Sequence, residues 1–238
     1  MQPRFCCANA RNYIRQPKPL YMEHRSFIKA GLLTLGVAGL VYSLGDVLLP
    51  NEADFLAARE RPQAFAALVT SQPFWIWSLR GMFGEALQAF GALGLLLLLR
   101  QAGQYRLGMW STVLFILAAQ LGMTFFTICH HVFPEAGRLM LAGQSGAEVM
   151  KLAIMPDFLL ASMVLKYVGL ILSAVALARS NCVPKWCGWV VLLGFLLIMV
   201  PLYAVQIGAN MLWGIAYLWM AFTLQEPYQA PRATQQAR

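Results

Sequence analysis

The sequence predicts an all-α fold: a polytopic membrane protein in which six transmembrane helices form a bundle and both termini lie in the cytoplasm. Composition is the first indication, since 59% of the 238 residues are hydrophobic and 12% are charged, against about 25% charged residues in soluble domains. The second is a series of long apolar stretches, and the third is a strong bias of Lys and Arg toward one side of them. Backbone groups in lipid must be hydrogen-bonded within their own segment, so each stretch is expected to be a helix.

Six apolar stretches define the predicted spans. Most have the roughly 18 residues or more that a helix needs to cross a hydrocarbon core of about 30 Å at 1.5 Å per residue. They comprise residues 30–49, 74–99, 109–132, 152–178, 188–205 and 208–224. The first stretch is too long for the apolar region of a signal peptide, and no A-x-A-like cleavage site follows it. We therefore interpret it as a retained anchor.

The last two predicted spans share only 37 residues, 188–224, so both crossings must be close to the minimum length. Pro201 and the stretch 206–210 offer helix-breaking and turn-forming residues. We expect a tight external hairpin with its turn at 206–209. The alternative is a five-span protein with a kinked last helix, which would place the C-terminal tail outside the cell.

The distribution of Lys and Arg predicts the orientation, because these residues are enriched in cytoplasmic connections. Twelve fall on the side of the two termini: Arg4, Arg11, Arg15, Lys18, Arg25, Lys29, Arg100, Arg106, Arg179, Lys185, Arg232 and Arg238. Four fall on the opposite side: Arg59, Arg61, Arg138 and Lys151. We therefore expect the connections 50–73, 133–151 and 206–209 to be external. The net charge of +8 then reflects topology and contact with anionic lipid headgroups.

Three segments are expected along the chain: a disordered basic N-terminal segment over 1–26, a transmembrane domain over 27–225 and a disordered cytoplasmic tail over 226–238. The first 21 residues contain three prolines and four Lys or Arg residues without apolar periodicity, a composition typical of disorder. We expect translation to begin at Met22. The six spans leave no room for a soluble catalytic domain.

Several classes of function are disfavoured by the sequence. Nucleic-acid binding is one, because no basic patch is interleaved with base-stacking aromatic residues. Haem held by two histidines of one chain is another: His24 lies on the opposite side of the membrane from His130 and His131, and these two neighbours point about 100° apart on a helix. Soluble-enzyme motifs such as G-x-S-x-G, H-E-x-x-H, the P-loop and G-x-G-x-x-G do not occur. We predict no cofactor and no metal, and we expect a lipid bilayer and a small-molecule or lipid ligand as partners.

Four charged residues stand out within the second and fourth predicted spans, because a charge costs about 2.5–3.5 kcal/mol at a helix centre. Arg80 of the second span and Asp157 of the fourth lie at matching depths of about 8–9 Å. Glu85 and Lys166 are deeper, at about 16 and 21 Å. We expect Arg80 to pair with Asp157, or otherwise with Asp46. Both pairs cannot share one straight seam between the two helices, because the two charges of each helix point in widely different directions.

The predicted binding site is a polar cavity near the external leaflet, formed by these charges and by polar residues at the external ends of the spans. Its candidate residues are Asp46, Arg80, Glu85, His130, His131, Asp157, Lys166, Gln206 and Asn210. The competing interpretation is that the charges only fix the register of the helices or extend toward the headgroups.

Two adjacent histidines near the external end of the third span indicate a second kind of site. His130 and His131, together with Glu135 and Asp157, could ligate a metal ion, because imidazole and carboxylate are suitable ligands. The simpler interpretation is a polar cap that ends the third span before Pro134.

The segment Val183-Pro184-Lys185-Trp186-Cys187-Gly188-Trp189 carries a family resemblance. This basic turn with Pro and Trp, entering a Gly-rich fifth span, resembles a bacterial six-span membrane family known only as a domain of unknown function. The resemblance extends loosely over 27–224 and includes Glu85. Gln120 and Asn210 stand where that family commonly has charged residues. The resemblance implies a bacterial cytoplasmic membrane and the same six-span plan, with no known substrate.

The sequence leaves two classes of function open. The expected one is a non-enzymatic membrane protein that acts in binding, in transport or as an accessory subunit through its polar cavity. The alternative is an intramembrane metal-dependent enzyme that uses His130, His131, Glu135 and Asp157.

Overall fold

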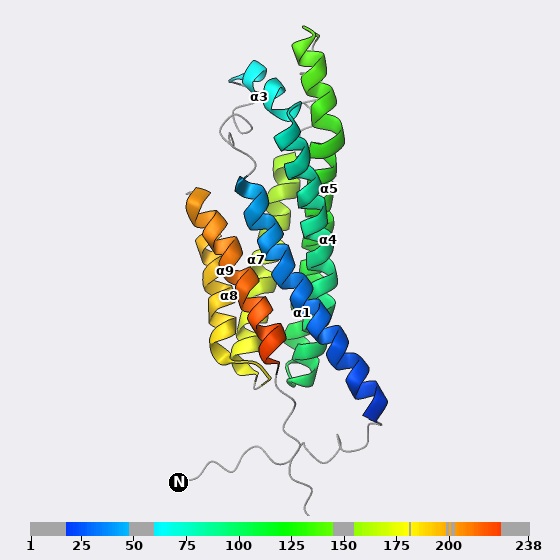
Figure 1. Ribbon diagram of the computed structural model, residues 1–238, viewed down its shortest axis with the longest axis vertical. Coiled ribbons are helices and arrows are strands. Elements are labelled where there is room, and N and C mark those ends of the chain that lie inside the picture. Colours follow the sequence, from blue (N-terminus) through cyan, green and yellow to red (C-terminus); the bar gives the residue numbers. More distant parts are fainter. Residues whose placement is uncertain are drawn as a thin grey trace, which may run out of the picture.

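The computed structural model describes residues 18–47, 60–144, 155–180, 182–198, 200 and 203–224, and every regular element in these ranges is an α-helix. The helices are α1 (Lys18–Val47), α3 (Pro62–Val69), α4 (Gln72–Gln101), α5 (Tyr105–Leu141), α7 (Met155–Arg179), α8 (Lys185–Ile198) and α9 (Tyr203–Thr223). Figure 1 shows the long helices side by side along the long axis of the molecule, with α3 at one end. The predicted all-α fold is confirmed.

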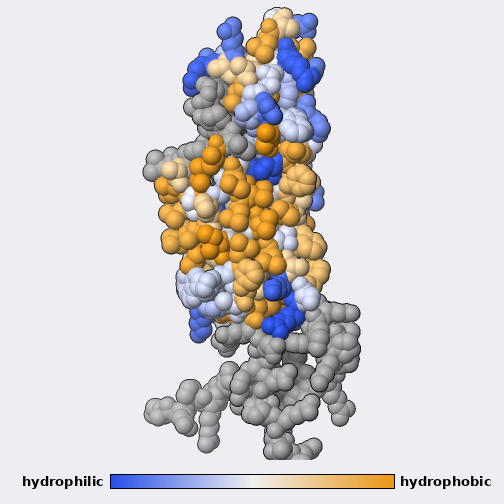
Figure 2. Space-filling view, viewed as in Figure 1, coloured by the Kyte–Doolittle hydropathy of each residue, from blue (hydrophilic) through white to orange (hydrophobic). Residues whose placement is uncertain are grey.

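Five of the described helices contain segments long and apolar enough to cross a membrane: Arg25–Gly45, Gln72–Gln101, Tyr105–Leu141, Phe158–Arg179 and Ala204–Thr223. The apolar helix α8 has 14 residues and extends about 21 Å, less than the ~30 Å of a hydrocarbon core. Figure 2 shows mostly apolar residues across the middle of the face in view, with more hydrophilic residues toward its two ends. These features are those of a multi-pass membrane protein.

The long helices form a closed ring in chain order. The packed pairs are α1 with α4, α4 with α5, α5 with α7, α7 with α8, α8 with α9, and α9 with α1. Neighbours in the ring run antiparallel, as Figure 1 shows for the successive helices. The beginning of α1, the α4–α5 turn, the α7–α8 connection and the end of α9 therefore lie at one end of the ring.

Glycines allow α1 to close the ring between α4 and α9. A Cβ atom on Gly31 would lie 2.6 Å from the Cα atom of Gly94 on α4, and one on Gly39 would lie 2.6 Å from the Cα atom of Gly214 on α9. Such backbone-to-backbone approach is the way membrane helices associate, because lipid provides no hydrophobic force between them. The two glycine contacts hold α1 against both neighbours.

Helix α5 continues through Pro134 to Leu141, so the prediction that the third span ends before Pro134 is wrong. A proline inside a helix removes one backbone hydrogen bond, but packing of α3 supports the extension. The Phe65 ring meets the Phe133 ring edge-on at 5.5 Å, and Val69 packs against Gly137. Membrane helices tolerate proline when a neighbouring element stabilises them in this way.

The turn between the last two helices also differs from the prediction. Residues 206–209 lie within α9, whereas α8 ends at Ile198 and α9 begins at Tyr203. The sequence between them contains a proline, a residue that has no N–H group to continue a helix. Phe195 stacks on Trp213 at 5.2 Å, and α8 packs along α9, so the two helices form an antiparallel hairpin and not one kinked helix.

The first helix begins earlier than expected. α1 starts at Lys18, so residues 18–26 belong to the helix and not to a disordered segment, whereas residues 1–17 and the tail 225–238 lie outside the described residues. Arg25 donates a hydrogen bond to the Leu224 backbone oxygen at 3.3 Å. This contact joins the beginning of α1 to the end of α9 and favours continuation of the helix before the first apolar stretch.

Candidate functional site

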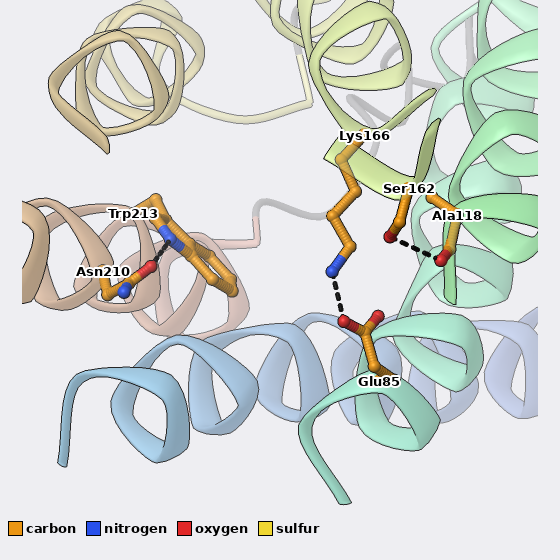
Figure 3. Close-up of polar contacts among 6 residues, drawn as sticks. All are labelled: Glu85, Ala118, Ser162, Lys166, Asn210 and Trp213. Atoms are coloured by element: carbon orange, nitrogen blue, oxygen red, sulfur yellow. Dashed lines mark hydrogen bonds and ion pairs between the residues drawn. The ribbon is translucent and has the colours of Figure 1, made fainter. Parts of the chain in front are cut away.

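An ion pair between Glu85 and Lys166 lies inside the ring. The Lys166 Nζ atom donates to the Glu85 Oε1 atom, and the side chains are 2% exposed for Glu85 and 17% for Lys166. Their helices, α4 and α7, are separated in the ring by α5, so the pair reaches across the interior (Figure 3). Each residue lies close to the middle of its helix.

Helix α5 positions both partners of this ion pair. A Cβ atom on Gly122 would overlap the Glu85 carboxylate, so this glycine allows the carboxylate to lie against α5. One helical turn before Lys166, the Ser162 hydroxyl donates to the Ala118 backbone oxygen at 2.8 Å (Figure 3). Serine hydroxyls that bind a neighbouring helix in this way fix its register in a membrane. α7 therefore presents Lys166 at the depth of Glu85.

The aromatic ring of Tyr42 on α1 lies between two cations. The Lys166 Nζ atom is 5.3 Å from its centroid, and the Arg80 Cζ atom is 5.6 Å from it. Both distances are within the range of cation–π attraction. Arg80 also donates to the Tyr42 backbone oxygen at 2.7 Å and lies 5.9 Å from the Trp77 ring. Arg80 is thus held by α1 and by its own helix.

The side chains of Asp46 and Asp157 lie outside the described residues. The expected pairing of Arg80 with Asp157, or otherwise with Asp46, therefore stays a prediction. Among the four charges of the second and fourth predicted spans, the structure describes a pair between the two deeper ones, Glu85 and Lys166.

A cavity of about 160 Å³ opens beside the ion pair, between five helices of the ring. Its walls combine polar groups with aromatic rings, and they are formed by Tyr42, Gln88, Met163, Lys166, Tyr167, Phe195, Ile198, Asn210 and Trp213. Asn210 is oriented by its own helix, since its Oδ1 atom accepts a hydrogen bond from Trp213 Nε1 at 3.1 Å (Figure 3). Among the predicted site residues whose side chains the structure describes, Lys166 and Asn210 line this cavity.

Two buried acceptor atoms of α4 have no hydrogen-bond partner among the described residues. They are the Oε2 atom of Glu85 and the Oε1 atom of Gln88, whose residues are 1% and 2% exposed. Residues three apart on a helix share a face, so both side chains leave α4 on its inner side. A buried acceptor without a donor costs about 1–3 kcal/mol.

The histidines lie elsewhere, between α4 and α5. His130 Nδ1 is 2.9 Å from the Ser78 hydroxyl, and its ring is 5.0 Å from the Trp75 ring. His131 packs edge-on against His130 at 4.8 Å. None of these residues lines the cavity between α1, α4, α7, α8 and α9.

Glu135 and Gln206 have partners of their own. Glu135 forms an exposed ion pair with Arg138 at 2.7 Å, and Gln206 Nε2 donates to the Val200 backbone oxygen at 3.3 Å. Within the described residues, no three His, Cys, Asp or Glu side chains are placed to hold one metal ion. Of the four residues of the metal-enzyme alternative, His130, His131 and Glu135 are therefore not placed to hold one ion, and the side chain of Asp157 lies outside the described residues.

Most of the residues that line the cavity were not predicted from the sequence. Gln88 could have been found, because it follows Glu85 by three residues and so must share its face of the helix. Tyr42, Phe195 and Trp213 carry no such signal, since aromatic residues are common throughout membrane spans and only the packing of the ring selects these three.

The fold and the site define the chain as a multi-pass helical protein with an ion pair and a polar cavity in its interior. In comparisons with known proteins, no protein-family model, no curated protein and no solved structure matches this chain. The resemblance to the bacterial six-span family stays a prediction.

Proposed function

We propose that this chain is a six-span protein of a bacterial cytoplasmic membrane, with both termini in the cytoplasm, that binds a small molecule in its interior. It acts without catalysis, as a binding protein, a transporter or an accessory subunit. The observation that carries the proposal is the cavity beside the ion pair of Glu85 and Lys166, which Lys166 itself lines. A purely structural ion pair needs no such space.

The proposed topology draws support from the ring. An even number of antiparallel helices returns the chain to the side from which it started, and α8 brings the ring to six helices. Of the described Lys and Arg residues, most lie toward the end of the ring that holds the beginning of α1 and the end of α9, as cytoplasmic ends do. α8 would provide the shortest crossing.

The metal-dependent enzyme has no comparable support. Its residues His130 and Glu135 are engaged by Ser78 and Arg138, and neither lines the cavity. The ion pair and the cavity support binding instead.

A larger side chain that fills the cavity should prevent a small molecule from binding there. Met163 lines the cavity and is 36% exposed, so Met163→Trp adds volume there while part of the new side chain can reach lipid. Val164→Trp is the matched control, because Val164 is 51% exposed and does not line the cavity. We expect native mass spectrometry of the protein released from nanodiscs to detect a bound small molecule in the wild type and in Val164→Trp, but not in Met163→Trp. Equal mass distributions for the three proteins would contradict the proposal.

A further inference from the structure

Helices α7 and α8 pack tightly near their connection and less tightly away from it. Near the connection, a Cβ atom on Gly188 would lie 2.8 Å from the Ala174 backbone oxygen, so the two helices are in direct contact there. Farther from the connection, residues of both helices line the cavity, namely Met163, Lys166, Tyr167, Phe195 and Ile198. In Figure 1 the two helices lie closer together at their connection than at their other ends. The cavity therefore lies where α7 and α8 diverge.

The α7 and α8 sides of the cavity continue into surfaces that face lipid. Met163 lines the cavity and is itself exposed. Leu160 and Val164, beside it on α7, are exposed as well, and they belong to a segment long and apolar enough to cross a membrane. On α8, the exposed side chains include Leu193 and Leu196. The opening of the cavity past Met163 is therefore bordered by apolar side chains at a depth where the surroundings are hydrocarbon.

The walls of the cavity favour hydrocarbon over water. Most of the lining residues are aromatic or aliphatic. Of the polar ones, Lys166 donates to Glu85, and Asn210 accepts a hydrogen bond from Trp213. A cavity holds water when it offers about two to four polar partners, and an empty space loses dispersion contacts with its walls. Hydrocarbon beside the opening can supply those contacts.

The volume of the cavity suits part of a chain. It is about 160 Å³, close to the roughly 150 Å³ of an engineered apolar cavity that holds benzene, a molecule of about six carbon atoms in size. A whole lipid is far larger than this. A segment of one acyl chain fits, while the rest of the lipid stays in the bilayer.

We infer that the gap between α7 and α8 is a lateral opening, through which an acyl chain of a membrane lipid enters the cavity past Met163. The ligand then reaches its site from the bilayer and not from the aqueous phase. The inference rests on the proposed function and adds the chemical class of the ligand and its route.

Photo-crosslinking tests the entry of the chain. The protein is placed in phosphatidylcholine nanodiscs that contain a fraction of phosphatidylcholine with a diazirine on one acyl chain. Illumination attaches this chain to the residue beside it, and mass spectrometry of peptides locates the label. We expect label on Phe195 or Trp213, which are buried and line the cavity. Trp219 is exposed on the surface of the same α9, so its label reports lipid outside the ring.

Two variants test the opening. Met163→Trp fills it, and we expect label on Phe195 and Trp213 to fall about fivefold or more, because a closely packed interior leaves no room for a chain. Val164→Trp is the matched control, since Val164 is exposed beside Met163 and does not line the cavity; it should keep the wild-type pattern. Label on Trp219 should be equal in all three proteins.

A charged thiol reagent tests the rival occupant, water. In a chain whose five cysteines are replaced by serine or alanine, Ile198→Cys places a thiol on the wall of the cavity. We expect this thiol to resist a membrane-impermeant methanethiosulfonate, whereas Gln144→Cys, at an exposed position after α5, should react. Equal reaction of the two thiols would show a water-filled cavity and overturn the inference.

The outcomes separate this inference from the proposed function. Label confined to lipid-facing residues such as Trp219, or equal label on Phe195 and Trp213 in Met163→Trp, would overturn lateral entry. A bound molecule detected by native mass spectrometry would then still support the proposed function. Label on Phe195 or Trp213 that Met163→Trp removes, together with equal mass distributions, would support lateral entry and contradict the proposed function.

Discussion

Lys166 of α7 donates to Glu85 of α4 across the interior of the ring, although α5 separates the two helices. The ion pair therefore links two helices that are not neighbours in the ring. Breaking a buried ion pair by removing one partner costs about 3–5 kcal/mol, since a lone charge is left behind, while replacing both partners by apolar groups is often neutral.

We expect Lys166→Met and Glu85→Leu each to lower the melting temperature more than the double variant Lys166→Met/Glu85→Leu does. Thermal unfolding in nanodiscs measures all three proteins. The exposed pair of Glu135 and Arg138 is the control: its side chains are 59% and 69% exposed, and such pairs contribute about 0.2–1 kcal/mol, so Arg138→Ala should have little effect. Additive losses in the cycle would show that the two charges do not interact.

Some of this site could be predicted from the sequence, because charges in apolar spans are rare and their depth follows from residue counting. Glu85 and Lys166 were expected as deep charges, and they are the pair that the structure describes. The two charges of each helix point in widely different directions, so the sequence also predicts that the second and fourth spans cannot form both pairs along one straight seam. The choice between the pairs depends on the position of α5, which no local pattern encodes.

The errors have a common physical origin in tertiary packing. Gly208 and Asn210 have the chemistry of a turn, yet both lie in α9, where Asn210 accepts a hydrogen bond from Trp213 of the same helix. Pro134 has the chemistry of a helix end, yet α3 packs against the helix beyond it. Local propensity predicts interruptions that packing then overrides.

The topology is tested by reporter fusions. We expect fusions after Gln101, Cys182 and Arg238 to behave as cytoplasmic and a fusion after Gln144 to behave as external, because Lys and Arg are concentrated around the first three positions. Enzymatic reporters that are active on only one side of the membrane provide the measurement. A fusion at Arg238 that alone reports an external location would indicate five crossings.

Cys182, in the connection between α7 and α8, should react with thiol reagents more slowly than a free thiol at neutral pH. Burial raises the pKa of its thiol, and only the thiolate is nucleophilic. A raised pKa means that the thiolate of Cys182 forms at higher pH. Its alkylation rate should therefore still increase with pH above the ordinary thiol pKa of about 8.5. The alkylation rate of glutathione, an ordinary thiol, begins to level off in that range. The experiment uses a chain in which the other four cysteines are replaced by serine or alanine. A rate that levels off at or below pH 8.5 would contradict the burial of this thiol.

Gly122 should be intolerant of a methyl group, because a Cβ atom there would overlap the Glu85 carboxylate. Gly122→Ala is expected to destabilise the protein by about 1–3 kcal/mol, the usual cost of overpacking, despite the helix propensity that alanine adds. Gly208→Ala is the matched control, since a Cβ atom on Gly208 meets open space; it should be neutral or stabilising by up to about 1 kcal/mol.

A second set of variants tests whether the loss of stability in Gly122→Ala comes from contact with the Glu85 carboxylate. In Glu85→Ala/Lys166→Met the carboxylate and its partner are both removed, so the added methyl group has room and Gly122→Ala should cost little. Melting temperatures of the four proteins in nanodiscs complete this cycle. An equal loss in both backgrounds would show that the methyl group collides with the α4 backbone, and Gly122 would then set the helix spacing and not the position of the carboxylate.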